Sequence, residues 1–137
     1  MTKSKTAGQL YDKYSVSLAD ITALGANASG SVTLDTLPAG TVITNVLLKP
    51  TTALAGGAVS AATARVTTTS PTKTFGTAAY DVFQATGDTV HSYDGTSQFM
   101  GIAATPALLL TFTTTGGNLN ALTAGAVDVY LEYETVI

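Results

Sequence analysis

The sequence predicts an all-β protein, an antiparallel β-sandwich or jelly roll of about seven or eight short strands. Apolar and polar residues alternate with a period of two in several segments, and Gly, Pro, Asn and Asp separate these segments. The composition agrees, because the chain has 26 threonines against 6 basic and 9 acidic residues, and a β-branched hydroxyl suits a pleated surface. A length of 137 residues fits one domain.

The N-terminal segment differs from the rest of the chain. Residues 1–9 are charged or small and show no alternation, so we expect a flexible arm that becomes ordered against a partner. Residues 10–137 contain no linker and no internal repeat, which predicts a single sandwich domain.

Two strands are expected early in this domain. Tyr14, Val16 and Leu18 alternate with polar residues and predict the first strand, and Val32 with Leu34 predicts the second. The residues between them, 19–30, are mostly small, and we expect a loop.

A clearer strand is predicted over residues 41–49, entered through a Pro-Ala-Gly turn. A weaker, threonine-rich strand follows over residues 60–68. The pair Gly56-Gly57 lies between the two, so the sequence predicts a hairpin at that point.

The middle of the chain predicts one short helix, near residues 77–85, ending before Gly87. Residues 89–93 and 96–100 then flank an Asp94-Gly95 pair, which is typical of a tight β-hairpin.

Two further strands complete the prediction. Residues 107–115 alternate and end at Gly116-Gly117, which we interpret as hairpin glycines. The C-terminal segment, 126–137, has the clearest period of two. Its two sets are Val127, Val129, Leu131 and Tyr133 against Asp128, Tyr130, Glu132 and Glu134.

The composition excludes several function classes. The absence of cysteine excludes disulfides, iron–sulfur clusters and thiol nucleophiles, and a single histidine excludes a multi-histidine metal site. A net charge of −3 argues against nucleic-acid binding. No apolar run approaches the ~18 residues of a membrane span, and the N-terminus carries no secretory signal. We therefore expect synthesis in a cytoplasm, with no cofactor, metal, nucleic acid or membrane partner.

Three groups of residues could carry chemistry, and each has a simpler interpretation. His91 shares a strand face with Tyr93, while Ser92 points the other way, so no triad is formed locally. The spacing of Asp81, Asp88 and Asp94 matches no calcium loop, and aspartate is a common turn residue.

A pair of glutamates is the third group. Glu132 and Glu134 lie roughly 7 Å apart on one strand face, and paired carboxylates can hydrolyse glycosides. They also fit the solvated side of the last strand, so we expect no catalytic residue and no enzyme.

The chain resembles small structural proteins of tailed bacteriophages in three stretches. They are LPAGTVITNVLLK over residues 37–49, TTALAGG over 51–57 and LTAGAVDVYLEY over 122–133. These stretches form strands and turns rather than an active site. The resemblance implies a small jelly-roll protein of the phage particle, of the type that decorates (cements) the outside of the capsid shell.

From this resemblance we expect a virion protein, made in the host cytoplasm and bound to the major capsid protein on the capsid exterior. A closed homo-oligomer, with a trimer favoured, would match the local symmetry between capsomers. The basic, tyrosine-containing N-terminal region supplies the candidate capsid contacts. These are Lys3, Lys5, Tyr11, Lys13 and Tyr14.

Two alternatives remain open at the level of sequence. The protein could be a head-fibre, neck or tail component of the virion. It could also be a carbohydrate-binding sandwich for host attachment, with Tyr80, Tyr93 and Phe99 as its candidate aromatic residues.

Overall fold

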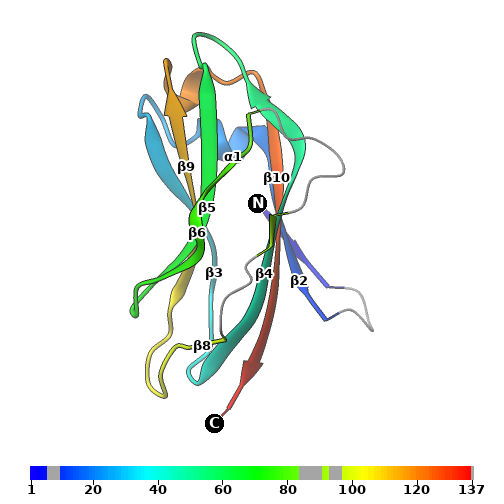
Figure 1. Ribbon diagram of the computed structural model, residues 1–137, viewed down its shortest axis with the longest axis vertical. Coiled ribbons are helices and arrows are strands. Elements are labelled where there is room, and N and C mark those ends of the chain that lie inside the picture. The colour runs from blue at the N-terminus through cyan, green and yellow to red at the C-terminus, as the bar shows by residue number, and fades with distance from the viewer. Residues whose placement is uncertain (6–9, 84–90, 93–96, 137) are drawn as a thin grey trace.

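The computed structural model describes residues 1–5, 10–83, 91–92 and 97–136. Within them the chain forms two antiparallel β-sheets stacked face to face, with one short α-helix and one 3₁₀ turn at the ends of strands (Figure 1). The predicted all-β sandwich is confirmed. None of the helices in the described part of the chain is long and apolar enough to cross a membrane.

Sheet A contains both chain ends. Its order is β1-β2-β10-β4, with β7 and β8 both paired to the far side of β4. The bounds are β1 Thr2–Ser4, β2 Asp12–Val16, β10 Ala124–Thr135, β4 Thr41–Ala55, β7 His91–Ser92 and β8 Gln98–Phe99.

Sheet B has the order β3-β9-β5-β6. The bounds are β3 Ser29–Thr36, β9 Ala107–Thr115, β5 Ala61–Thr69 and β6 Lys73–Asp81. Because β7 and β8 follow one another along the same edge of β4, they occupy the place of one strand. The two sheets then have the four-plus-four order of a jelly roll, and β1 is an additional edge strand.

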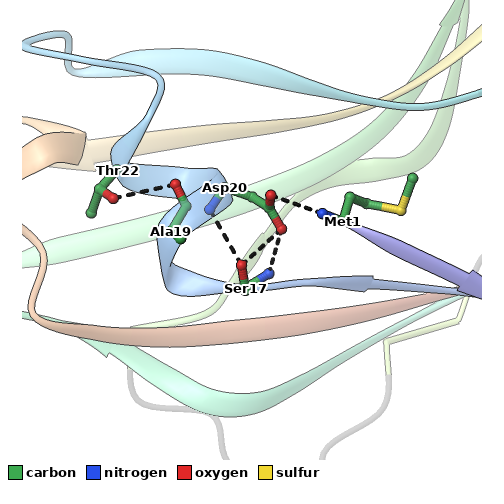
Figure 2. Close-up of polar contacts among 5 residues, drawn as sticks. All are labelled: Met1, Ser17, Ala19, Asp20 and Thr22. Atoms are coloured by element: carbon green, nitrogen blue, oxygen red, sulfur yellow. Dashed lines mark hydrogen bonds and ion pairs between the residues drawn. The ribbon is translucent and has the colours of Figure 1, made fainter.

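The first departure from the sequence prediction is helix α1, Leu18–Thr22, within and just before the expected loop. It begins with a capping box, in which Asp20 N–H donates to Ser17 Oγ and Ser17 N–H donates to Asp20 Oδ2 (Figure 2). The Ser17-x-x-Asp20 pattern predicts such a start. Leu18 therefore belongs to a helix rather than to the first strand.

The second departure concerns residues 77–85. The prediction of a helix there is wrong over the described residues. Residues up to Asp81 belong to strand β6, where Tyr80 pairs with Ala64 and Asp81 with Thr63. Pairing continues at Val82, whose N–H donates to Ala62 O. A nine-residue helix is marginal by itself, whereas a strand here satisfies the open edge of β5. Residues 84 and 85 lie outside the described part.

The sandwich interior is filled by the apolar set of each alternating strand, as the period of two predicts. Phe112 and Leu110 of β9, Leu48 of β4, Leu131 of β10 and Phe75 of β6 are all at most 1% exposed. This pattern confirms the inward set that the sequence predicted for β10.

The paired glycines join the two sheets rather than the strands of a hairpin. Gly56-Gly57 connects β4 of sheet A to β5 of sheet B, and Gly116-Gly117 leads from β9 of sheet B towards β10 of sheet A. Gly56 has φ +139°, and a Cβ there would overlap Thr123 N and lie 2.7 Å from Thr123 Oγ1. A tight crossover against a neighbouring backbone therefore requires glycine.

We predict that Gly56→Ala destabilises the fold much more than Gly101→Ala. Both glycines have positive φ, +139° and +102°, so each substitution costs ~1 kcal/mol of backbone strain. Only Gly56→Ala adds overlap, worth a further ~1–3 kcal/mol, because the nearest atom to a Cβ at Gly101 is 3.9 Å away. Urea denaturation of the two variants measures the difference, and equal losses would contradict the close approach.

Candidate partner-binding surface

The five residues predicted to contact a partner lie at the β1–β2 edge of sheet A. Thr2–Ser4 of the expected arm form β1, which pairs antiparallel with β2, and residues 6–9 lie outside the described part. Alternation divides the five between two faces. Lys3 and Tyr14 are cross-strand neighbours on the inward face, whereas Lys13 lies on the outward face with Tyr130 of β10.

The inward group connects the two sheets. Asp35 of β3 is its centre: Lys3 Nζ lies 2.6 Å from Asp35 Oδ2, and Tyr14 OH donates to the same oxygen at 2.7 Å. Lys3 and Lys5 also lie within 3.6 and 3.7 Å of the Asp12 carboxylate. The strands β1 and β2 of sheet A are thereby held to β3 of sheet B at the open edge of the sandwich.

These contacts shift the ionisation of their members. Burial raises the pKa of Asp35, but hydrogen bonds from Lys3, Tyr14 and the Thr36 N–H outweigh it, so the net pKa is lowered. The hydrogen bond to Asp35 raises the pKa of Lys3. Burial, followed by the hydrogen bond to Asp35, raises the pKa of Tyr14. Each shift favours the charge state present at neutral pH.

A second charged contact lies at the start of α1. The Met1 ammonium group donates to Asp20 Oδ1 at 2.8 Å, on the carboxylate that also caps the helix (Figure 2). This hydrogen bond and that from Ser17 N–H lower the pKa of Asp20. The N-terminal strand is therefore held at both of its ends by carboxylates.

The outward group forms a half-exposed surface with two tyrosines. The rings of Tyr11 and Tyr130 meet edge to face with centroids 6.5 Å apart, and Asn45 Nδ2 donates to Tyr11 OH at 3.0 Å. Lys13 Nζ lies 5.9 Å from the Tyr130 ring centroid and 3.5 Å from Asp128 Oδ2. Held aromatic rings with polar edges are typical of binding surfaces.

We call this surface the tyrosine face. Its residues come from β2 and its approach, from β10 and from β4, and they share the outer side of sheet A. They are Tyr11, Lys13, Asn45, Leu47, Asp128 and Tyr130.

Tyr14 was predicted to contact a partner, which requires an exposed ring, but it lies in the interior. Its ring is 0% exposed, and its hydroxyl is used by Asp35. In this structure it holds the sandwich together instead of presenting an anchor. The alternation of Tyr14 with Val16, already visible in the sequence, was the signal that it faces inward.

The candidate chemical groups are not brought together among the described residues. His91 pairs through its backbone with Leu48, while its side chain and the whole of Asp88 and Asp94 lie outside the described part. Asp81 Oδ1 accepts from Phe83 N–H, a turn contact. Over the described ranges, no group of three His, Cys, Asp or Glu side chains could hold a metal ion.

The two glutamates of β10 also have ordinary surroundings. Glu132 Oε1 accepts a 2.6 Å hydrogen bond from Thr44 Oγ1 on the neighbouring strand. Glu134 is exposed, two residues further along the same face. One carboxylate is thus engaged by the sheet and the other lies in solvent.

Sheet B presents a contrasting outer face. Three cross-strand rows run over β3, β9 and β5, and most of their side chains carry a hydroxyl group. Ser31 Oγ lies 2.7 Å from Thr111 Oγ1. The rows contain Ser29, Thr113 and Thr63; Ser31, Thr111 and Arg65; and Thr33, Leu109 and Thr67. Five of the 26 threonines of the chain lie in these rows.

No protein-family model matches the sequence, and no curated protein matches it either. Among solved structures, the chain is similar to one from the capsid asymmetric unit of cyanophage Pam1, with a TM-score of 0.59 and 16% identity. The similarity covers 99% of this chain and 94% of that one, so the two share the fold over their full lengths. A chain from a structure described as "CBM4 structure and function" aligns with a TM-score of 0.28 and 13% identity, over 98% of this chain and 88% of that one. This score is too low to carry an argument.

We predict that Asp35→Asn reduces the loss of stability in acid. The folded pKa of Asp35 lies below the unfolded value of ~3.9, so its contribution is complete above about pH 4 and is lost as pH falls through the folded pKa. The variant should be less stable than wild type at pH 7 and should lose less between pH 5 and pH 2. Urea midpoints across this range measure both effects.

Glu134→Gln is the matched control for this prediction. Glu134 is exposed and forms no ion pair among the described residues, so its removal should leave the acid profile close to that of wild type. An Asp35→Asn profile that overlies wild type would show that the contact with Lys3 and Tyr14 contributes nothing to folding.

Proposed function

We propose that the protein is a non-enzymatic structural component of a bacteriophage virion and that it decorates the capsid exterior. The observation that carries this proposal is the full-length similarity to a chain of a phage capsid asymmetric unit, 99% of this chain against 94% of that one. The sequence resemblance over residues 37–49, 51–57 and 122–133 also supports the proposal.

The composition supports an assembly role. With 11% charged residues, against roughly a quarter in ordinary domains, the protein can cover surface on a neighbour without burying many ions, which is costly. A catalytic site would instead require several convergent ionisable groups.

The partner we propose is the major capsid protein, and the proposed contact is the tyrosine face. Tyr11 and Tyr130 present large, rigid rings whose orientation is fixed by one another and by Asn45, which lowers the entropy cost of binding. Lys3 and Lys5 extend this region along the adjacent edge of the sheet. Their side chains are 43% and 52% exposed.

Weak contacts suffice for this role because of repetition. Many copies that each bridge neighbouring capsid subunits act through multivalency, so modest single-site affinity yields lattice-wide reinforcement. A trimer would present three tyrosine faces with the symmetry of the points where capsomers meet.

Two other functions are compatible with the same fold. A head-fibre, neck or tail component would share the fold but bind at one position on the particle. Electron cryomicroscopy of virions with and without the protein separates these cases, because decoration requires density repeated over the whole lattice, and density at a single vertex would exclude it.

A carbohydrate-binding role requires exposed aromatic rings. Of its candidate residues, Phe99 is 47% exposed, Tyr80 is partly buried against the core, and Tyr93 lies outside the described part. Binding to a glycan array that is lost in Phe99→Ala, together with absence of binding to capsids, would favour this role over decoration.

We predict that Tyr11→Ala weakens binding to capsids that lack the protein by roughly 30-fold or more, the effect of removing an aromatic hot spot. Co-sedimentation with such capsids over a range of protein concentrations measures it. Thr113→Ala, an exposed change on the outer face of sheet B, is the matched control and should bind as wild type does.

Because Tyr11 packs against Tyr130, the melting temperatures of both variants are measured to establish that they are folded. Wild-type binding by Tyr11→Ala together with weak binding by Thr113→Ala would move the proposed contact to sheet B. Wild-type binding by both would exclude these two positions as anchors.

A further inference from the structure

The strand β1 is held to the sandwich by few contacts. Its three residues, Thr2–Ser4, are all exposed, and among the described strands it pairs with β2 alone (Figure 1). Burial of apolar surface therefore contributes little to its position. What holds it is backbone pairing along one edge, together with the contacts of nearby charged groups.

Two carboxylates receive the lysines of this segment. Lys3 Nζ lies 2.6 Å from Asp35 Oδ2 and 3.6 Å from Asp12 Oδ2, and Lys5 Nζ lies 3.7 Å from Asp12 Oδ1. The lysine side chains are about half exposed, so the solvent and its ions screen these contacts. Salt and acid can therefore weaken the charged contacts of β1.

A bulge in β3 directs Asp35 to this place. The register of β3 against β9 shifts between Thr33 and Asp35, so that Asp35 pairs with Leu108, which is buried in the sandwich. With regular alternation, Asp35 would share the outer face of sheet B with Thr33. Bulges re-aim side chains in this way. The irregularity in β3 thus supplies the carboxylate that Lys3 contacts.

The contacts that close this edge of the sandwich do not all depend on β1. Tyr14 belongs to β2 and donates to Asp35 Oδ2, and Thr36 N–H donates to Asp35 Oδ1. The strand β2 is itself paired with β10 from Asp12 to Val16. Without β1, Asp12 would face water, so no unpaired charge would remain buried.

We propose that β1 is a charge-controlled strap, which salt or acid releases from the edge of β2 while the sandwich stays folded. In place, β1 presents a very short edge with a lysine, and both properties discourage pairing with other chains. Its release uncovers the longer edge of β2. The strap therefore determines whether that edge is available, whether or not the protein binds a capsid.

Acid acts on the strap through its carboxylates. The ionisable groups of this cluster are Asp35 of β3, Lys3 of β1 with Lys5 beyond it, Asp12 and Tyr14 of β2, and Tyr133 of β10. The pKa of Asp35 lies below its unfolded value, so its contribution is complete above about pH 4 and is lost as pH falls through the folded pKa. The Met1 ammonium contacts Asp20, whose pKa is also lowered, and this contact responds in the same direction.

Hydrogen exchange of backbone amides in the full-length protein measures release of the strap. The N–H groups of successive residues in β2 point to opposite sides, so one set bonds β1 and the other bonds β10. Protection factors of the set facing β1 should be at least about 100-fold below those of amides between β10 and β4, because β1 opens locally.

Salt and pH should change this first set alone. Raising the salt concentration from about 0.01 M to about 1 M shortens the Debye length from ~30 to ~3 Å and should lower its protection roughly threefold. Lowering the pH from about 7 to about 3 should lower it roughly tenfold. Amides between β10 and β4 report unfolding of the sandwich and should keep their protection.

Lys3→Gln tests the central cation of the strap. It should lower the protection of the amides facing β1 roughly fivefold and reduce their dependence on salt. Lys73→Gln is the matched control, because Lys73 lies on sheet B and forms no ion pair within the described residues. Melting temperatures within a few degrees of wild type show that both variants are folded.

A disulfide can fasten the strap reversibly. Thr2→Cys with Ser15→Cys places two cysteines at a cross-strand pair of β1 and β2, where the separation of Cα atoms suits a disulfide. The chain has no other cysteine. The oxidised variant should lose the salt and acid dependence of the amides facing β1, and the reduced variant should behave as wild type does.

Three results would overturn the proposal. The amides facing β1 could exchange only together with those between β10 and β4, which would show that β1 leaves only when the whole sandwich unfolds. Lys3→Gln could exchange no faster than Lys73→Gln. The oxidised double-cysteine variant could also keep the salt dependence of wild type, which would place the effect of salt elsewhere.

Discussion

The register between β10 and β4 is the constraint on which the rest of the structure depends. These are the two longest strands, and they pair from Ala124↔Ala55 to Thr135↔Thr41 through three register shifts. Where Val129 meets Leu48, the pair forms the core; where Tyr130 meets Leu47, it forms the tyrosine face. A slip of one residue would exchange the two sets, burying Tyr130 and exposing Val129. The same pairing therefore positions both the tyrosine face and the interior of the sandwich.

The open edge of the sandwich is closed by charge rather than by apolar packing. β1 is three residues long and all three residues are exposed, so burial contributes little to holding it. Its stability derives from backbone pairing with β2 and from Lys3 on Asp35 and Asp12. Partly exposed ion pairs are each worth little, but the buried hydroxyl of Tyr14 joins Asp35 to the core. The edge that carries the proposed capsid contacts is thus held to the other sheet at one carboxylate.

The fold class and the strictly alternating strands could be predicted from the sequence. In such a strand the positions of the apolar residues alone show which face is buried. The alternation of β10 and β9 required no knowledge of neighbours. The sequence could not show whether Gly56 lies in a hairpin or in a crossover between sheets, because both favour a glycine with positive φ. Only the assignment of β4 and β5 to different sheets distinguishes the two. The helix near 77–85 failed for a related reason: the edge of β5 decides its conformation, and that edge is remote in sequence.

The candidate site could likewise be predicted only as far as neighbouring residues in the sequence determine it. The sequence shows a charged and aromatic N-terminal region, but it does not show how the region divides into an inward and an outward group. That division depends on Asp35, 21 residues from Tyr14, and on Tyr130, which is far away in the sequence. The composition also bears on which outer face of the sandwich binds a partner. Hydroxyl side chains of sheet B meet across strands at two places, Ser31 with Thr111 and Ser29 with Thr113, so part of that face is polar without being charged. The outer face of sheet A differs, because it presents the rings of Tyr11 and Tyr130, which hold each other edge to face. Large rings held in place are typical of binding surfaces, and this is why the proposed contact lies on sheet A.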